Sequence, residues 1–280
     1  MTIRFRQITR IITGTPAVDG AGVSLTRVIG PGDVRELDPF LMLDAFDSVD
    51  PKEYLAGFPW HPHRGIETIT YLIEGDVEHR DSLGHQGSIK SGDAQWMTAG
   101  SGIIHQEMPV ATKRLWGAQL WVNLPRKDKL CAPHYGDILH ETIPMVSEQG
   151  VDVRVISGLY KDQKGAFQGT YVPVTLWDVT LDRSQVWSVS PDPTHTVFLY
   201  LFSGGLHIDG KLIKDRRAVL FGEGDRVQVR AGGDGEARFL FLSAPPLHEP
   251  VAWGGPIVMN TQLELQEAFE ELQNGNFLKH

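Results

Sequence analysis

The sequence predicts an all-β protein that consists of two tandem antiparallel β-barrels of the jelly-roll type. Its 280 residues include 30 Gly and 17 Pro, more than the average usage of about 7% and 5%. This excess favours many tight turns. Short runs of β-branched and aromatic residues recur about every ten residues, and no helical pattern separates them, which indicates antiparallel strands rather than βαβ units.

The first β-rich region begins with the run 67–73, which ends close to Gly75. Further short strands are expected at 86–89, 94–97 and 117–122, each bounded by Gly or Pro. The segment 125–150 is polar, contains Pro and has weak periodicity, so we interpret it as a connection. We therefore expect one domain at residues 1–135 and a second at residues 136–280.

The second β-rich region repeats this organisation. A strand expected at 196–202 ends near Gly205, and a strand at 218–222 precedes Gly224. The interval from Gly75 to Gly92 is 17 residues and the interval from Gly205 to Gly224 is 19. This faint internal repeat favours two similar barrels in tandem.

One amphipathic helix is expected near the C-terminus. Thr261 and Glu264 fit a capping box, and Gly275 is a suitable helix stop. Between them, apolar residues recur at helical spacing: Leu265, Ala268, Phe269 and Leu272. We expect this helix to pack on a barrel.

Charge and cysteine content exclude several classes of protein. The formal net charge is −9, and the basic clusters at 126–129 and 214–217 are short and interrupted by acidic residues, so direct nucleic-acid binding is not expected. The one cysteine, Cys131, cannot form an intrachain disulfide, which favours a reducing compartment. The longest apolar run, 197–202, is too short for a membrane span. We expect a soluble cytoplasmic monomer without a secretory signal or a membrane contact.

The residues with the clearest chemistry are two pairs at i and i+2: His61 with His63, and His105 with Glu107. In an extended strand such pairs point to the same face. If both strands belong to one barrel, three imidazoles and one carboxylate converge. Histidine is the commonest metal ligand, and this set suits one divalent ion: Fe, Mn, Co, Ni, Cu or Zn. Open coordination positions would remain for substrate and for oxygen or water.

The residues near these pairs allow more than one interpretation. Pro62 lacks an N–H donor, so its strand is expected to be an edge or irregular strand. Glu67 either supports a ligand histidine by a hydrogen bond or is an ordinary surface carboxylate. Cys131 is a weak candidate for a nucleophile. Five apolar residues either line a pocket or belong to the core: Phe58, Trp60, Met97, Ile103 and Trp116.

The remaining histidines lack such pairing, and we expect them to be surface or hydrogen-bonded residues. They are His79, His85, His134, His140, His195, His207, His248 and His280. The second region also lacks an equivalent ligand set. The positions offset from its glycines as the ligands are in the first region hold Pro191, Pro193, Ser190, Asp192 and Ala237. We expect its barrel to be structural or to form part of a partner surface.

Four segments, 58–71, 79–82, 95–107 and 254–261, resemble the pirin family of two-domain cupins. The resemblance spans nearly the whole chain and implies a bicupin fold. It also implies one mononuclear metal, usually iron, in the N-terminal barrel. The family's ligand pattern falls on His61, His63, His105 and Glu107. Glu67 occupies the position of a ligand in the general cupin motif, but the pirin pattern favours Glu107.

The resemblance implies a function as well. Bacterial members of the family resemble quercetin 2,3-dioxygenases, which open flavonols with O₂ and release CO, and this chemistry would use Fe(II). Glu107 would then be both a ligand and the catalytic base. The alternative is a non-catalytic, iron- or redox-responsive regulator of transcription or metabolism that binds a protein partner. A metal-free sugar isomerase is a third possibility, and the intact ligand quartet argues against it.

Overall fold

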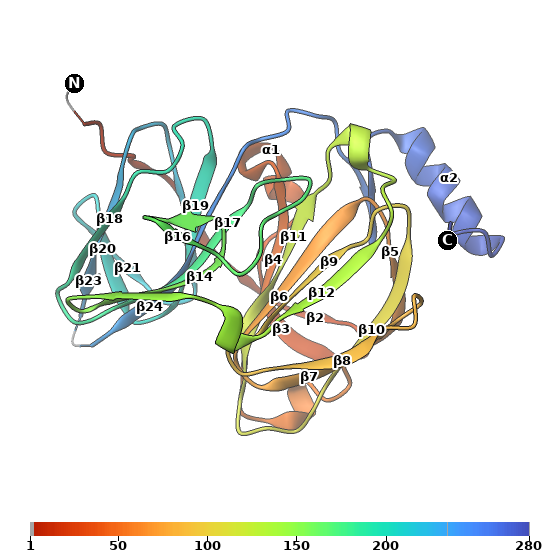
Figure 1. Cartoon of the computed structure of the whole chain (residues 1–280), viewed down its shortest axis with the longest axis horizontal. Coiled ribbons are helices and arrows are strands. Elements are labelled where there is room, and N and C mark those ends of the chain that lie inside the picture. The colour runs from red at the N-terminus through yellow and green to blue at the C-terminus, as the bar shows by residue number, and fades with distance from the viewer. Residues whose placement is uncertain (1–2, 234, 280) are drawn as a thin grey trace. The chain divides into compact units, whose positions relative to one another are not determined.

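The computed structural model describes residues 3–233 and 235–279 and consists mainly of β-strands (Figure 1). The chain divides into two compact units. We call the unit made of Thr15–His140 and Leu247–His280 the N-terminal barrel, and the unit made of Met1–Gly14 and Glu141–Pro246 the C-terminal barrel. The predicted all-β fold is confirmed. Within the described residues, no helix is long and apolar enough to cross a membrane.

The N-terminal barrel contains a seven-stranded and a four-stranded sheet, both antiparallel where strands pair. The larger sheet has the order β12 (His134–Ile138), β9 (Ala94–Thr98), β6 (Ile66–Glu74), β11 (Leu115–Asn123), β4 (Phe40–Ser48), β3 (Val23–Ile29) and β2 (Thr15–Asp19). The smaller sheet has the order β5 (Phe58–His63), β10 (Ile103–Pro109), β7 (Asp76–Asp81) and β8 (Gln86–Lys90).

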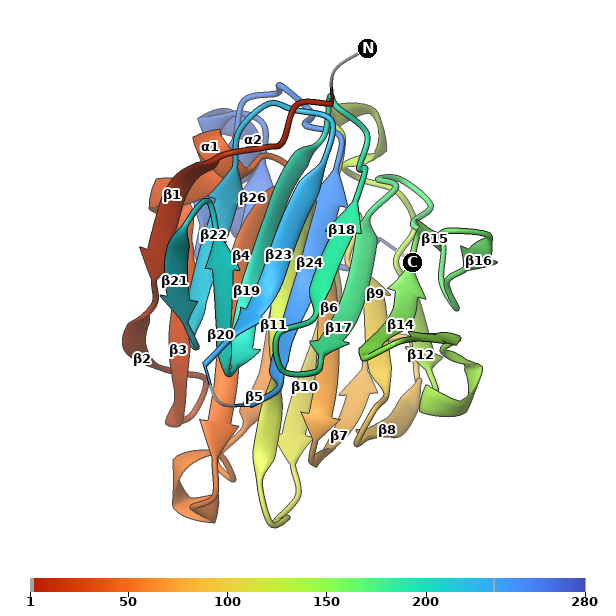
Figure 2. The ribbon, with the colours of Figure 1, turned by 90° about the vertical axis from the view of Figure 1, so that its left-hand side faces the viewer.

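The C-terminal barrel repeats this organisation, except that its outermost strand precedes the other strands of the barrel in the chain, whereas β12 follows those of the N-terminal barrel. Its seven-stranded sheet has the order β1 (Ile8–Thr13), β22 (Arg217–Phe221), β19 (Thr196–Ser203), β24 (Ala237–Ala244), β17 (Thr175–Leu181), β14 (Val151–Ser157) and β13 (Met145–Glu148). Its four-stranded sheet has the order β18 (Val186–Val189), β23 (Val227–Gly232), β20 (Gly205–Ile208) and β21 (Lys211–Lys214). Figure 2 shows β22, β19 and β24 side by side. The internal repeat predicted from the glycine spacing is therefore a repeat of whole sheets.

The remaining elements connect or flank the sheets. They are α1 (Val34–Leu37), the hairpin of β15 (Leu159–Tyr160) and β16 (Gln163–Lys164), the hairpin of β25 (Ala252–Gly254) and β26 (Ile257–Met259), and α2 (Gln262–Gln273). Four short 3-10 turns cover Pro31–Asp33, Pro51–Glu53, Arg126–Asp128 and His140–Thr142.

The observed division of the chain differs from the predicted boundary at residues 135 and 136, and both ends of the chain are reassigned. Strand β1 pairs with β22 and so completes the C-terminal barrel. Strand β12, in the segment interpreted as a connection, pairs with β9. Helix α2 belongs to the N-terminal barrel. Long-range strand pairing decides this arrangement, and composition along the chain carries no signal for it.

Helix α2 begins with the predicted capping box, in which Thr261 and Glu264 each accept a hydrogen bond from the other's backbone N–H. Leu265 and Ala268 are buried. A second anchor is the buried Arg64, whose Nη1 donates to Glu271 Oε2 at 2.7 Å and whose Nη2 donates to the Phe277 carbonyl at 2.7 Å. Because Arg64 directly follows strand β5, it ties the C-terminal segment to the end of that strand.

The two barrels have different interiors. Trp177, Trp187, Phe239 and Phe241 pack against one another in the C-terminal barrel, within one apolar cluster. The N-terminal barrel has many buried polar side chains in its interior. They include Asp44, His63, Thr68, Thr70, His79, Asp81, Gln95, His105 and Glu107. Burial of polar groups is costly unless they find partners, so this interior is where a functional site is expected.

Gly65 fixes the turn after β5. Its φ is +78°, and a Cβ atom there would lie 1.9 Å from the Val258 carbonyl oxygen. Gly84 has a similar φ of +88° but has no atom within 4 Å of the position of a Cβ. The two glycines share the left-handed backbone, which costs a non-glycine residue about 1–2 kcal/mol, but only Gly65 is also packed against backbone.

We predict that Gly65→Ala lowers the melting temperature more than Gly84→Ala does. The strain is similar in both variants, whereas the clash with Val258 adds several kcal/mol only at Gly65. For a domain of this size about 1 kcal/mol corresponds to about 2–4 °C, so Gly65→Ala should melt at least about 4 °C below Gly84→Ala. Calorimetry of both variants tests this, and equal melting temperatures would contradict it.

Candidate metal centre

Strands β5 and β10 bring three histidines together. They pair antiparallel, with His105 opposite His61 and Ile103 opposite His63. One ligand atom from each of His61, His63 and His105 lies within 4.8 Å of the others. Strand β5 is at the edge of its sheet, as predicted from Pro62. Among the described residues, no other cluster of three or more histidine, cysteine or acidic side chains has such spacing.

Two backbone carbonyls set the orientation of His61 and His63. The Nδ1 atom of His61 lies 2.8 Å from the Pro59 oxygen, and Nδ1 of His63 lies 3.1 Å from the Pro256 oxygen. A carbonyl oxygen accepts only, so each Nδ1 must carry the proton. In the neutral rings the Nε2 atoms then present lone pairs, and these two atoms are 3.1 Å apart. Two facing lone pairs at this distance repel each other, and a cation between them would remove the repulsion.

His105 gives a second indication of a missing partner. Both of its ring nitrogens are buried and have no hydrogen-bond partner. Burial, followed by the nearby His63 and His61, holds the pKa of His105 well below its ordinary value. Burial and then His61 also lower the pKa of His63, to about 3. Neutral imidazoles are the form that binds metals, so these residues fit a divalent ion.

Glu107 lies on the same face of β10 as His105 and is buried. It does not belong to the group of three histidines. Gln119 Nε2 donates to Oε1 and Oε2 of Glu107, at 3.0 Å each, and Thr70 Oγ1 donates to Oε1 at 3.2 Å. The structure therefore gathers three of the four predicted ligands and holds the fourth by hydrogen bonds.

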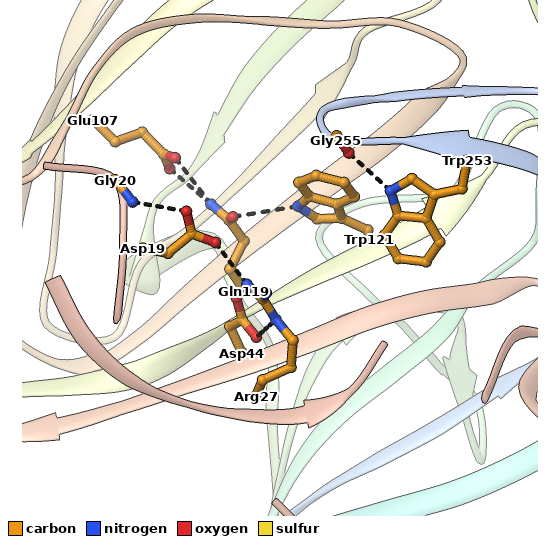
Figure 3. A network of polar contacts seen from close by, with 9 residues as sticks. All are labelled: Asp19, Gly20, Arg27, Asp44, Glu107, Gln119, Trp121, Trp253 and Gly255. Atoms are coloured by element: carbon orange, nitrogen blue, oxygen red, sulfur yellow. Dashed lines mark hydrogen bonds and ion pairs between the residues drawn. The ribbon is translucent and has the colours of Figure 1, made fainter. Parts of the chain in front are cut away.

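Trp121 fixes the amide of Gln119 (Figure 3). Its indole Nε1 donates to Gln119 Oε1 at 3.3 Å. Because the indole can only donate, the amide oxygen faces Trp121 and the amide nitrogen faces Glu107. The Trp121 ring also packs against His63, with 4.9 Å between ring centroids. One tryptophan thus contacts both a histidine of the cluster and the residue that holds Glu107.

A cleft of about 610 Å³ opens onto His61 and His63. This volume is within the range of small-molecule sites. Its lining combines aromatic and apolar side chains with charged and polar ones. The lining residues used below are Met42, Phe58, Trp60, Trp121 and Trp253, together with Asp19, Arg27, Asp44 and Gln119.

The charged part of the lining, which we call the charged side of the cleft, is one guanidinium between two carboxylates (Figure 3). Arg27 Nε and Nη2 donate to Asp44 Oδ1 and Oδ2 at 3.0 and 2.7 Å, and Nη2 also donates to Asp19 Oδ2 at 2.7 Å. Burial raises the pKa of Asp44, while Arg27 opposes this effect. The hydrogen bonds that Arg27 donates to Asp44 and Asp19 raise the pKa of Arg27, so the guanidinium stays charged.

The other predicted residues fall into several groups. Phe58 and Trp60 line the cleft, whereas Met97 and Ile103 belong to the core. Trp116 stacks under the Arg114 guanidinium at 4.0 Å. Cys131 is half-buried and forms no disulfide.

Glu67 is fully buried, so it is not a surface carboxylate. Its Oε1 accepts a hydrogen bond from Thr98 Oγ1 at 2.7 Å. Burial raises the pKa of Glu67 to about 7.

Several unpaired histidines are hydrogen-bonded, as expected. His79 contacts Asp137, His85 contacts Asp81, His140 contacts Asp93 and His195 contacts Ser243. His79 is nevertheless buried in the barrel rather than on its surface. His280 lies outside the described residues.

Sequence reasoning missed Arg27, Asp44, Gln119, Trp121 and Trp253. A signal existed for two of them. Asp44 interrupts the apolar strand Phe40–Ser48, and Gln119 interrupts Leu115–Asn123. A polar residue within an apolar strand is worth examining, because buried polar groups need partners.

The fold and the cluster define the class of the protein: a bicupin whose N-terminal barrel carries a histidine cluster compatible with one metal ion. Two family models match the chain, Pirin over residues 22–122 and the Pirin C-terminal cupin domain over residues 176–278. The protein therefore belongs to the pirin family.

Individual relatives agree with this. A pirin-like protein of Caulobacter vibrioides is 42% identical, with 97% of this chain and 99% of the relative covered. A Pseudomonas aeruginosa protein described as a candidate quercetin 2,3-dioxygenase is 43% identical, with 97% and 98% covered. The crystal structure of a quercetin 2,3-dioxygenase from Acinetobacter baumannii has a TM-score of 0.89 at 32% identity, with 98% of each chain covered.

We predict that the histidine cluster binds about one metal ion per chain. His61→Ala combined with His105→Ala should lose most of this metal, because one of the three imidazoles remains. His195→Ala, in the C-terminal barrel, is the control and should retain it. Elemental analysis after desalting measures the content, and full occupancy in the double variant would disprove the assignment.

Proposed function

We propose that this protein is a metal-dependent dioxygenase that opens flavonols such as quercetin with O₂ and releases CO. The observation that carries the proposal is the convergence of three imidazoles at an aromatic-walled cleft of about 610 Å³. Relatives named for quercetin 2,3-dioxygenase activity support it. We propose Fe(II) as the metal, and the same residues would also accept Mn, Co, Ni, Cu or Zn.

His61, His63, His105 and Glu107 would hold the ion. A bound divalent metal would act as a Lewis acid that lowers the pKa of the flavonol 3-hydroxyl. The deprotonated flavonol is a better electron donor to O₂ than the protonated one. The three histidines would bind through the nitrogens that face the cluster. For His61 and His63 these are the Nε2 atoms, since each Nδ1 proton is donated to a carbonyl.

Glu107 would take the proton from the flavonol 3-hydroxyl. Its Oε1 already accepts from Thr70 and Gln119, whereas Oε2 accepts from Gln119 alone. Oε2 therefore has more spare capacity and is the oxygen we assign to the proton. A positioned carboxylate of this kind acts as a general base. Gln119 keeps the carboxylate in place, and Trp121 keeps Gln119 in place.

The remaining side chains of the cleft would bind and shield the substrate. Phe58, Trp60, Trp121 and Trp253 offer faces for flat aromatic rings, which favour offset or edge contacts with such side chains. Enclosure by these rings would also keep water from reactive species.

The proposal is tested by adding quercetin to anaerobically purified, Fe(II)-loaded protein and then admitting O₂. Equal amounts of O₂ should be consumed and CO released as the ring opens. Without turnover at full metal occupancy, the dioxygenase proposal fails and a non-catalytic role of the same site becomes the better explanation.

We predict that methylation of the flavonol 3-hydroxyl abolishes turnover. The methyl ether has no proton for Glu107 to remove and is a poor ligand for a metal. O₂ uptake is compared at matched concentrations of the two compounds. A flavonol that is methylated on a hydroxyl of the pendant ring and keeps its free 3-hydroxyl is the control. Equal turnover of the 3-methyl ether would remove direct ligation from the mechanism.

We predict that Glu107→Gln reduces turnover more than it reduces metal content. The amide oxygen can still coordinate, and three imidazoles remain, but the amide cannot accept a proton at neutral pH. Loss of a general base costs about 10²–10⁴-fold in rate. Single-turnover ring opening and metal content are measured on the same preparation, and a metal-loaded variant within about threefold of the parent rate contradicts the base role.

A further inference from the structure

A row of polar residues crosses the larger sheet of the N-terminal barrel. Directly opposed partners place Gln95 of β9 beside Thr70 of β6, Thr70 beside Gln119 of β11, Gln119 beside Asp44 of β4, and Asp44 beside Arg27 of β3. Opposed residues on neighbouring antiparallel strands share one face of the sheet, with Cβ atoms about 4.5–5.5 Å apart. Gln95, Thr70 and Asp44 are buried, and Thr70 donates to Glu107 of the smaller sheet, so the row lies on the inner face.

The row joins the proposed base to the charged side of the cleft. Its middle members, Thr70 and Gln119, donate to Glu107. Its last members, Asp44 and Arg27, line the cleft with His61 and His63. Because Gln119 is the direct neighbour of both Thr70 and Asp44, a single flat ligand at the histidines can also reach the charged pair.

The charged pair offers both donors and acceptors. Arg27 uses Nε and Nη2 for Asp44 and Asp19, and its Nη1 has no hydrogen-bond partner among the described residues. Each Asp44 oxygen accepts one of these bonds, which leaves lone-pair capacity on both. A phenolic hydroxyl can donate to such a carboxylate and accept from such a guanidinium at the same time.

The net charge of Asp19, Arg27 and Asp44 disfavours anions at this end of the cleft. Two carboxylates, Asp19 and Asp44, surround one guanidinium, so the group carries one net negative charge. A ligand carboxylate can only accept and would meet like charges in a partly enclosed site, where charges are less screened than in water. Neutral hydroxyl groups avoid this repulsion.

We propose that Arg27 and Asp44 determine substrate specificity: they bind the phenolic hydroxyls at the end of the flavonol away from its 3-hydroxyl, and they reject carboxylates at that end. The inference rests on the function proposed above, because it assumes that the 3-hydroxyl end faces the histidines. It names polyhydroxylated, uncharged flavonols as the substrate class.

The test is anaerobic isothermal titration calorimetry on the full-length, Fe(II)-loaded chain, in which ligands bind without turnover. Three flavonols with the same core are compared, one without hydroxyls on the pendant ring, one with a 3′,4′-dihydroxy ring and one with a 4′-carboxylate. A hydrogen bond to a charged group should make the dihydroxy compound bind about tenfold more tightly than the unsubstituted one. The carboxylate should bind at least about tenfold more weakly than the unsubstituted compound.

Asp44→Asn removes the charge but keeps the shape and one acceptor oxygen. In this variant the dihydroxy compound should bind within about threefold of the unsubstituted compound. The loss of affinity of the 4′-carboxylate compound, relative to the unsubstituted one, should shrink in proportion. Asp47→Asn is the matched control, because Asp47 lies on the same strand but is exposed, pairs with Arg114 and lies outside the cleft. It should keep the parent pattern.

A second variant covers the case in which Asp44→Asn does not fold, as judged by circular dichroism and metal content. Arg27→Gln leaves Asp19 and Asp44 in place without the neutralising guanidinium. It should therefore weaken binding of the 4′-carboxylate compound further and also reduce the preference for the dihydroxy compound. The inference is overturned if the parent binds all three compounds within about threefold of one another. It is also overturned if a folded Asp44→Asn or Arg27→Gln variant keeps the parent pattern.

These outcomes are separate from failure of the proposed function. Binding without selectivity, followed by ring opening when O₂ is admitted, overturns the inference and leaves the function in place. Selective binding without ring opening supports the specificity role of the pair but contradicts the dioxygenase proposal. Absence of binding by any of the three flavonols overturns both.

Discussion

The site depends on two backbone carbonyls that turn neighbouring imidazoles toward each other. The carbonyl oxygens of Pro59 and Pro256 accept hydrogen bonds from Nδ1 of His61 and His63. The two Nε2 atoms, which carry the lone pairs, then lie 3.1 Å apart. A third imidazole, that of His105, is buried beside them without a hydrogen bond. Burial keeps the rings of His63 and His105 neutral. A metal ion would resolve the repulsion and supply the missing partner together, so the cluster is compatible with one metal ion.

The comparison of the two barrels shows that the sheet order alone does not make this site. Ten of the eleven strands described in each barrel occur in the same order, and only the outermost strands β12 and β1 differ in their place along the chain. The C-terminal barrel fills its interior with stacked aromatic rings such as Trp177 and Phe241, and it is stable by apolar burial. In the N-terminal barrel, part of the interior is occupied by three histidines and by the polar row from Gln95 to Arg27 instead of apolar side chains. One architecture thus supports a packed core in one half and a site in the other.

Much of the fold and the histidine cluster could be predicted from the sequence, because periodicity and spacing report local geometry. The strands 67–73 and 94–97, the capping box at Thr261 and the convergence of His61, His63 and His105 follow from rules of period and pairing. The places of β1, β12 and α2 could not be predicted, because they depend on pairing between residues far apart in the chain. The hold of Gln119 on Glu107 was missed for the same reason, since only the register of β6, β10 and β11 brings these side chains together.

If three imidazoles surround one metal, as we propose, X-ray absorption spectroscopy at the iron edge detects them directly. The full-length protein is loaded anaerobically with Fe(II), and excess metal is removed. We predict a first shell of light nitrogen and oxygen ligands together with the outer-shell scattering of imidazole rings, at an amplitude that fits the three histidines of the cluster. A spectrum without imidazole scattering, or one that is unchanged in His61→Ala with His105→Ala, would contradict it.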